Sequence, residues 1–162
     1  MKFHQHRGEY LEFAGIDPFL AEIIRQIPLA AIPGDDAAAN ARLFSSPSAD
    51  PDDLSRDWKE FVVPDLQFQF DSALTQVQCD LNESFAETTG GDDFCLRVPK
   101  DHLDEWLSAL NQARLVLAAR HGFSDDELAE RFQPKLTSLR GLALYQITIY
   151  GWMQELLLST VR

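Results

Sequence analysis

Near its end the chain carries an almost uninterrupted apolar run, GLALYQITIYGWMQELLL, over residues 141–158, and any fold must bury most of it. The run approaches the length of a membrane span, but Gln146 and Gln154 would be costly in lipid. If the run is helical, its polar residues form a stripe covering about a quarter of the circumference: Thr148, Glu155 and Ser159. We therefore expect a central core helix over residues 138–161 and no membrane span.

The composition indicates one folded domain with a large core. The 162 residues are 45% hydrophobic and include eleven Phe and three Trp, enough apolar material to fold without disulfides or metal. The N-terminal sequence MKFHQHRGEY has no apolar run of the signal-peptide type, and two cysteines are too few for a secreted disulfide scaffold. We expect a cytoplasmic protein, and no motif implies a cofactor.

The charge disfavours nucleic acid as a partner. The formal net charge is -12, and such a surface repels phosphate backbones and anionic lipid. The last thirty residues are a local exception, because they hold one acid, Glu155, and three basic residues: Lys135, Arg140 and Arg162. DNA binding would require these three to cluster with Arg7 and Arg120.

The hydrophobic periodicity predicts a mostly α protein, a single helical-bundle-like domain over residues 1–162 with a small antiparallel sheet of two or three strands. A β-hairpin is expected over 1–15 and a short strand near 94–98. Asp17 and Pro18 begin a helix assigned to 16–32, and the Pro-, Ala-, Ser- and Asp-rich segment 33–53 is expected to be a connector. The helical body over 54–162 holds the remaining expected helices: about 52–62, 65–85, 101–122, a short one near 124–132, and 138–161.

A charged residue interrupts the apolar face of the helix expected over 101–122. Leu103, Leu107, Leu110 and Leu117 fall within a narrow arc at 3.6 residues per turn. Arg114 lies inside that arc. A desolvated guanidinium without a carboxylate costs several kcal/mol, so a partner is expected.

Two interpretations of Arg114 are open. Glu155 is the one acid of the last thirty residues, and Asn111 lies one turn before Arg114. In the favoured interpretation Arg114 and Glu155 form a structural ion pair and Asn111 satisfies the remaining donors, so Arg114→Met would cost about 3–5 kcal/mol. In the alternative, these three residues line an open ligand-binding pocket with free donors.

His4 and His6 share one strand face, and Glu9 and Glu12 could approach them across the hairpin. Two imidazoles and a carboxylate can bind zinc. A terminal H-x-H on an exposed edge strand more often is solvated, so a strand without metal is the favoured interpretation and a zinc site the alternative.

Cys79 and Cys95 lack metal-ligand spacing. They are either a redox pair or two unrelated reduced thiols, and thiol labelling after mild peroxide separates the two cases. Cys79 and Phe68 both point away from the apolar stripe of the helix expected over 65–85. An apolar residue there either touches a second layer or marks a partner surface.

The helix that carries Arg114 also carries a family resemblance. WLSALNQARLVLAARHG, residues 106–122, followed by GWMQELL, residues 151–157, resembles the domain of unknown function 2017 family, known mainly from actinobacteria. The segments EYLEFAGIDPFLAEIIRQI and RLFSSPSADPDD are similar to further parts of that family. The chain departs from it at His4 and His6, where relatives tend to carry Arg or Lys, and over residues 68–91, which match little.

The resemblance implies an intracellular regulatory or adaptor-like protein and no catalytic residue. Genes of the family often lie beside that of the ClpS protease adaptor and a small sulfur-carrier cysteine-synthesis cluster. The leading hypothesis is a non-enzymatic protein that acts through contacts with an unidentified protein partner, or as a homodimer. The alternatives are a small-ligand or metal-dependent enzyme with a site around Asn111, Arg114 and Glu155, and a DNA-binding stress regulator.

Overall fold

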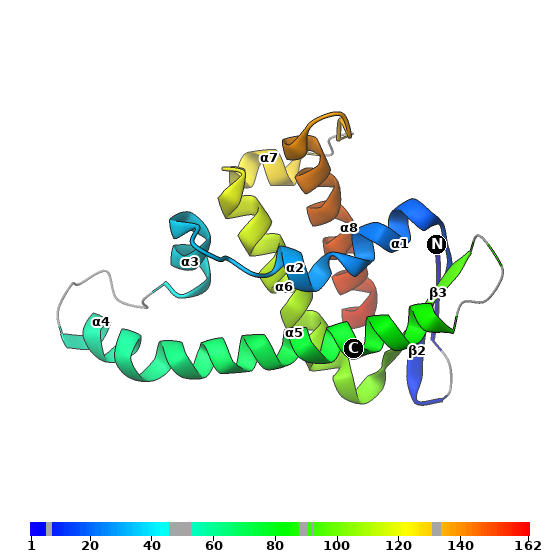
Figure 1. Ribbon diagram of the computed structural model, residues 1–162, viewed down its shortest axis with the longest axis horizontal. Helices are drawn as coiled ribbons and strands as arrows, with labels where there is room; N and C mark the ends of the chain where they lie inside the picture. Colours follow the sequence, from blue (N-terminus) through cyan, green and yellow to red (C-terminus); the bar gives the residue numbers. More distant parts are fainter. Residues whose placement is uncertain (6–7, 46–52, 88–90, 92, 131–133) are drawn as a thin grey trace.

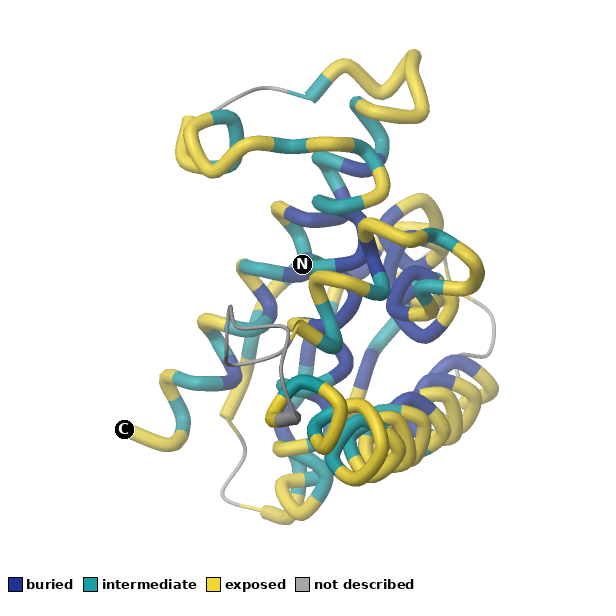
Figure 2. Tube along the Cα trace, turned by 90° about the vertical axis from the view of Figure 1, so that its left-hand side faces the viewer, coloured by how far each residue is buried: buried dark blue, intermediate teal, exposed yellow. Residues whose placement is uncertain are grey.

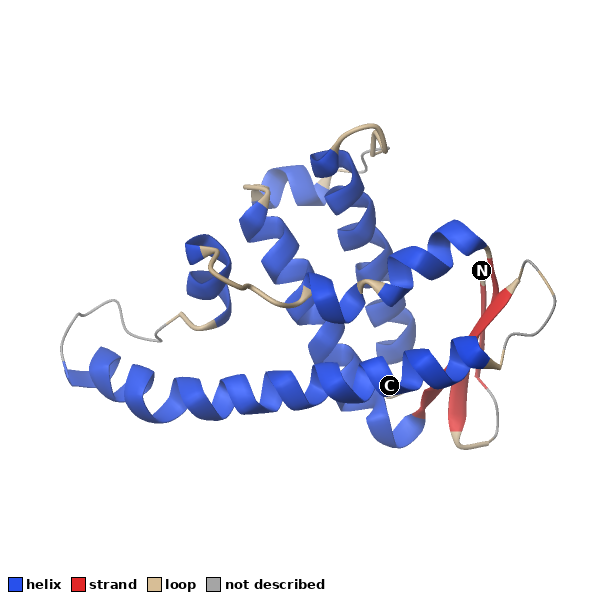
Figure 3. Cartoon of the chain, viewed as in Figure 1, coloured by secondary structure: helices blue, strands red, loops and turns tan. Residues whose placement is uncertain are grey.

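A computed structural model describes most of the chain: residues 1–5, 8–45, 53–87, 91, 93–130 and 134–162. Over these residues the protein is mostly helical and carries one small antiparallel sheet (Figure 1, Figure 3). The predicted fold class is confirmed.

The sheet has three antiparallel strands in the order β1 (Lys2–Gln5), β2 (Tyr10–Ile16) and β3 (Phe94–Pro99). The central strand pairs Phe13 with Phe3 on one side and with Leu96 on the other. Alternation along β2 directs Leu11 and Phe13 into the core, where both are fully buried. The strands therefore lie where the alternating sequence patterns predicted them.

The helical elements are, in chain order, α1 (Pro18–Arg25), α2 (Ile27–Ala30), α3 (Ala37–Leu43), α4 (Asp53–Asp57), the π-helical η1 (Trp58–Val62), α5 (Val63–Ala86), the 3₁₀ turn η2 (Lys100–His102), α6 (Leu103–Arg120), α7 (Asp125–Ala129) and α8 (Leu139–Ser159). The Asp17 side chain caps α1 by accepting a hydrogen bond of 2.9 Å from the Leu20 backbone N–H. Gly122, with φ of 64°, follows α6 and allows the chain to turn there.

Two sequence predictions need correction. The helix expected over 16–32 is divided at Gln26 into α1 and α2. The segment 33–53, expected to be a connector, contains α3, and the described part of it packs against α6. The Asp36 side chain caps α3 through a 2.8 Å hydrogen bond from the Ala39 backbone N–H. An N-cap aspartate before a run of alanines was therefore a helix signal within a loop-like composition.

Helix α8 packs against α6 along most of its length, as the apolar run required. Its polar core residues are satisfied by the N-terminal helices, because Gln146 donates to Gln26 (2.9 Å) and the Tyr150 hydroxyl donates to the Ile23 carbonyl (2.7 Å). Burial raises the pKa of Tyr150 well above its ordinary value. Within the described residues, no helix has both the length and the apolar character needed to cross a membrane.

Helices α4, η1 and α5 form one long rod that runs across the base of the bundle (Figure 1). The buried residues of α5 begin at Ala73. The half that precedes Ala73, residues 53–72, extends past α3 and is named the arm here. Figure 2 looks along the rod from the arm end: its near turns are exposed or half-buried, and the buried residues lie on one face of its far turns.

Candidate functional site

Arg114 lies on the flank of α6 that faces α7 and α8, and it is half-buried. Its Nη1 donates a 2.7 Å hydrogen bond to the Gln154 side-chain oxygen on α8. Its Nε is buried and has no hydrogen-bond partner among the described residues. Gly151 packs against the guanidinium so closely that a Cβ there would come within 3.3 Å of Nε. The arginine is therefore held from one side of α8, with most of its N–H donors unused by the described residues.

The predicted ion pair between Arg114 and Glu155 is wrong. No carboxylate among the described residues forms an ion pair with Arg114. Glu155 is exposed, on the same polar stripe of α8 that also exposes Thr148 and Ser159. Asn111 is exposed as well and is not hydrogen-bonded to Arg114. The neighbour of Glu155 in the chain, Gln154, takes the place expected for the acid.

The buried face of α6 is not centred on the leucine row that contains Arg114. The fully buried residues of α6 form an arc shifted toward one side of the leucine row: Trp106, Ala109, Leu110, Ala113 and Val116. Leu103 and Leu107 are only half-buried, so they mark the edge of the core, and Arg114 lies with them. Two alanines carry little hydrophobic signal in a sequence, yet they let α6 approach its neighbours closely.

Two depressions meet at Arg114. The first has a volume of about 420 Å³ and is lined by Arg42, Asn111, Arg114 and Ser124 among others. The second, the α7–α8 cleft, has a volume of about 610 Å³. Its walls carry Arg114, Glu130, Trp152 and Glu155 together with apolar residues of α7 and α8. The three residues predicted as a site thus line adjoining depressions, and they do not form one closed cluster.

We expect Arg114→Met to lower the free energy of unfolding by only about 1 kcal/mol, because one hydrogen bond is lost and no buried carboxylate is left unpaired. Glu155→Gln should change it by less than about 0.5 kcal/mol, and the double variant should show the sum. Urea unfolding of the parent and the three variants measures these values. A loss of about 3–5 kcal/mol that Glu155→Gln reverses would restore the ion pair.

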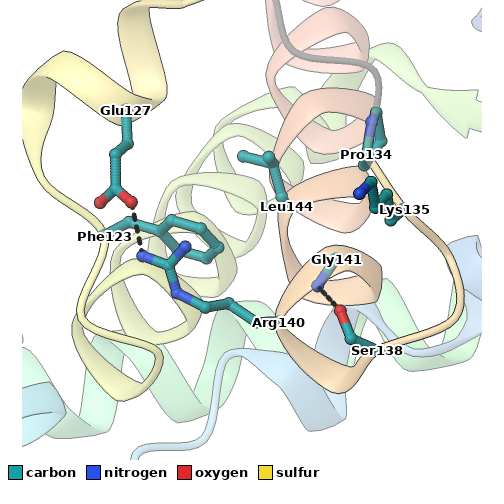
Figure 4. Close-up of a pocket in the computed structure, with 8 residues that line it drawn as sticks. All are labelled: Phe123, Glu127, Pro134, Lys135, Ser138, Arg140, Gly141 and Leu144. Carbon is teal, nitrogen blue, oxygen red and sulfur yellow. Dashed lines mark hydrogen bonds and ion pairs between the residues drawn. The ribbon is translucent and has the colours of Figure 1, made fainter.

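A smaller pocket of about 310 Å³ lies where α8 begins, and Figure 4 shows its lining. Arg140 lies over the Phe123 ring, 4.1 Å from its centroid, and donates from Nη2 to the Glu127 carboxylate (2.8 Å). It also donates from Nε to the His121 carbonyl (3.2 Å). Hydrogen bonding from the Ser124 backbone, followed by that from Arg140, lowers the pKa of Glu127. These contacts join the end of α6, α7 and the start of α8.

The basic residues considered for DNA binding do not form one patch in the described part of the chain. Lys135 and Arg140 line the same pocket, and the charge of Arg140 is paired with Glu127. Arg162 follows the opposite end of α8, about 30 Å away at 1.5 Å per residue. Arg120 donates to the Ile32 carbonyl (2.9 Å). The fifth residue of that set, Arg7, lies outside the described residues.

A buried polar cluster that the sequence analysis missed is centred on Asp80 of α5, which is 4% exposed. The Trp106 indole N–H donates to one carboxylate oxygen (2.8 Å), and His102 Nδ1 lies 3.0 and 3.1 Å from the two oxygens. Gln76 donates to the carboxylate as well, at 3.2 Å. The cluster ties α5 to η2 and α6. The sequence did contain one indication of this cluster: Asp80 lies one helical turn after Val77, beside the apolar stripe of α5.

The proposed histidine metal site can be placed only in part. His4 lies on β1 opposite Glu12 of β2, whose carboxylate contacts Arg97 at 3.4 Å. His6 lies outside the described residues. Within the residues that are described, no group of three or more His, Cys, Asp or Glu side chains is arranged to hold a metal ion.

Cys79 and Cys95 are both free thiols in the structure. Cys79 is exposed on α5, whereas Cys95 is half-buried on β3. Burial, and then the nearby Glu12 carboxylate, raise the pKa of Cys95. A raised pKa leaves less thiolate, the form that oxidants and alkylating agents attack.

We expect iodoacetamide at neutral pH to modify Cys79 first and Cys95 about tenfold more slowly. The rate at Cys95 should rise as the pH is raised, because its thiolate fraction rises. Timed alkylation followed by peptide mass spectrometry measures both rates. Equal rates in the folded protein would contradict the buried environment of Cys95, and alkylation in urea provides the unfolded control.

The arm carries large exposed apolar residues. Leu54, Phe61 and Phe68 are 71%, 64% and 75% exposed. Successive members are seven residues apart, and the π-helical η1 between Leu54 and Phe68 has more residues per turn than an α-helix, so the three recur along the exposed surface of the arm and are called the exposed row here. Of the two interpretations left open for Phe68, the structure contradicts contact with a second layer.

A family model described as a domain of unknown function (DUF2017) matches residues 10–161. No curated protein and no solved structure matches the chain. The matched residues include both depressions beside Arg114, the Asp80 cluster and the arm.

Proposed function

The chain belongs to the domain of unknown function (DUF2017) family, and we propose that it is a non-enzymatic regulatory or adaptor-like protein that binds a protein partner through its arm. The observation that carries the proposal is the exposed row Leu54, Phe61 and Phe68. Apolar side chains of this size gain free energy when a partner covers them, at about 25 cal/mol per Å². Apolar side chains that recur along an exposed helical arm suit a partner that lays an apolar helix or extended segment along it.

The charges beside the row favour a basic partner. The exposed charged residues of the arm comprise two basic and four acidic side chains: Arg56, Lys59, Asp57, Glu60, Asp65 and Asp71. A second copy of the chain would bring another acidic surface against this one, and the whole chain has a net charge of -12. We therefore assign to the arm a partner whose apolar residues are flanked by Lys and Arg.

Site-specific photocrosslinking in the native host tests this. A photoreactive benzoylphenylalanine in place of Phe61 should crosslink to a partner peptide that is apolar and flanked by basic residues. The same group in place of Leu139, which is 80% exposed on α8, is the matched control and should not capture that peptide. Adding Phe68→Ser and Leu54→Ser should abolish the crosslink.

Two outcomes would contradict the proposal. Equal capture of one partner from both positions would show that the arm is not the binding surface. A crosslink from Phe61 to a second copy of the chain would identify a homodimer in place of a basic partner.

A second candidate function is the binding of a small ligand at Arg114, and it has separate support. Arg114 and Glu155 line a cleft without pairing, and the guanidinium keeps unused donors. A cleft with free, partly desolvated donors is a common form of ligand site. This candidate does not depend on the arm.

A further inference from the structure

The guanidinium of Arg114 has more hydrogen-bonding capacity than the protein uses. An arginine side chain carries five N–H donors. The described residues accept only one bond from it, at Gln154. The Nε atom is shielded from solvent and unbonded, so the arginine carries part of the cost of burial without the compensation of a partner.

The chain has 26 acidic and 14 basic residues, yet no acid in its described part forms an ion pair with Arg114. Two acids do line the α7–α8 cleft together with Arg114: Glu155 on α8 and Glu130 at the end of α7. Neither forms an ion pair with it. The cleft thus presents one positive and two negative groups that do not neutralise one another.

Apart from Thr148, the other side chains that line the cleft are apolar, and the cleft is of suitable size. Its volume of about 610 Å³ lies within the usual range of small-ligand pockets, about 300–1,000 Å³. Leu128, Leu144 and Ile147 supply aliphatic wall, and Trp152, 39% exposed, supplies an aromatic surface. Gly151 lets the guanidinium lie directly against α8, because a Cβ would meet Nε, Cζ and Nη2 at 3.3 to 3.5 Å.

We propose that the α7–α8 cleft binds a zwitterionic small molecule of the amino-acid type, with its carboxylate on Arg114, its ammonium group on Glu155 and its apolar side chain against Ile147 and Trp152. This inference rests on the second candidate function. A simple anion would satisfy Arg114 but would be repelled by Glu130 and Glu155. A simple cation would be attracted by Glu130 and Glu155 but would leave the unused donors of Arg114 without an acceptor. A ligand with both charges satisfies both walls, and a carboxylate matches the planar fork of a guanidinium.

Calorimetric titration of the full chain tests the charge requirement with three matched probes. L-leucine carries both charges, 4-methylpentanoate carries the carboxylate without the ammonium group, and isopentylamine carries the ammonium group without the carboxylate. L-methionine and L-phenylalanine extend the test to other apolar side chains. We expect at least one amino acid to bind and both single-charge probes to bind about tenfold more weakly or not at all.

Variants of the two charged groups locate the site. Arg114→Met should weaken amino-acid binding by about tenfold or more. Arg114→Lys should weaken it less, because lysine keeps the positive charge but lacks the planar, bidentate guanidinium. Glu155→Gln should reduce the affinity for leucine to that for 4-methylpentanoate. Arg56→Met and Glu60→Gln, on the arm, are matched controls and should leave binding unchanged. Unfolding curves establish that each variant is folded.

The outcomes separate the inference from the function on which it rests. If 4-methylpentanoate binds as well as leucine and Glu155→Gln has no effect, the zwitterionic ligand is overturned while a ligand site at Arg114 stands. If none of the five probes binds, the zwitterionic ligand and the ligand site at Arg114 are both overturned for apolar amino acids and their single-charge analogues. Binding that survives Arg114→Met would overturn the placement in this cleft.

Discussion

Replacing Asp80 with alanine is expected to lower the free energy of unfolding by about 3–5 kcal/mol. The Asp80 carboxylate accepts from Trp106 and Gln76 and lies within hydrogen-bonding distance of His102 Nδ1. Trp106 is fully buried, so its indole N–H would have no acceptor in the variant. The variant would also leave a small cavity where α5, η2 and α6 meet.

Urea unfolding followed by tryptophan fluorescence measures the loss. Asp80→Asn retains one acceptor oxygen and should lose about half as much. Asp71→Ala, an exposed acid on the same helix, should change stability by less than about 0.5 kcal/mol. An Asp80→Ala variant as stable as the Asp71→Ala control would show that the cluster contributes no net stability.

Gly141→Ala is expected to lower stability by about 2 kcal/mol, although alanine favours a helix over glycine by about 1 kcal/mol. The substitution is destabilising despite the helix preference for alanine, because the Lys135 carbonyl oxygen occupies the position that a Cβ at Gly141 would take. Ser138, which caps α8 by accepting from the Gly141 backbone N–H (3.0 Å), holds the chain in this close approach (Figure 4). Relief of the overlap requires the backbone around Lys135 to move.

Gly151→Ala is the matched control on the same helix. Its Cβ would meet the Arg114 guanidinium, the mobile end of a long side chain, and not a backbone carbonyl. We expect a stability within about 1 kcal/mol of the parent, because the gain in helix preference offsets the displacement of Arg114. Thermal unfolding of both variants distinguishes them. Equal stability of the two would show that the segment before α8 adapts without cost.

The sequence predicted the polar stripe of α8 and the outward-facing Phe68, but it did not predict the buried cluster at Asp80. The polar stripe of Thr148, Glu155 and Ser159 was predicted and is exposed, yet the same stripe excludes Glu155 from the buried ion pair assigned to it. Phe68 was identified as an outward-facing apolar residue, and Leu54 and Phe61 extend it into a row. Asp80 was missed because a single acid beside an apolar stripe does not reveal which residues will reach it.

The sequence by itself determined the features that depend on neighbours along the chain. The apolar run of α8 required a core helix, Asp17 and Pro18 set the start of α1, and alternation in β2 chose its buried face. The hydrophobic effect and the capping of backbone groups act within a few residues, so such patterns are local.

The tertiary structure alone decided which arc of α6 is buried, and so whether Arg114 meets Glu155 or opens onto a cleft. Helical periodicity orders residues around one axis, but it leaves open the rotation of that axis against its neighbours. That rotation was set by close packing at Ala109 and Ala113 and by the bond from Trp106 to Asp80. These contacts join residues far apart in the chain, which is why only the folded molecule shows a half-buried arginine that has no acidic partner among the described residues.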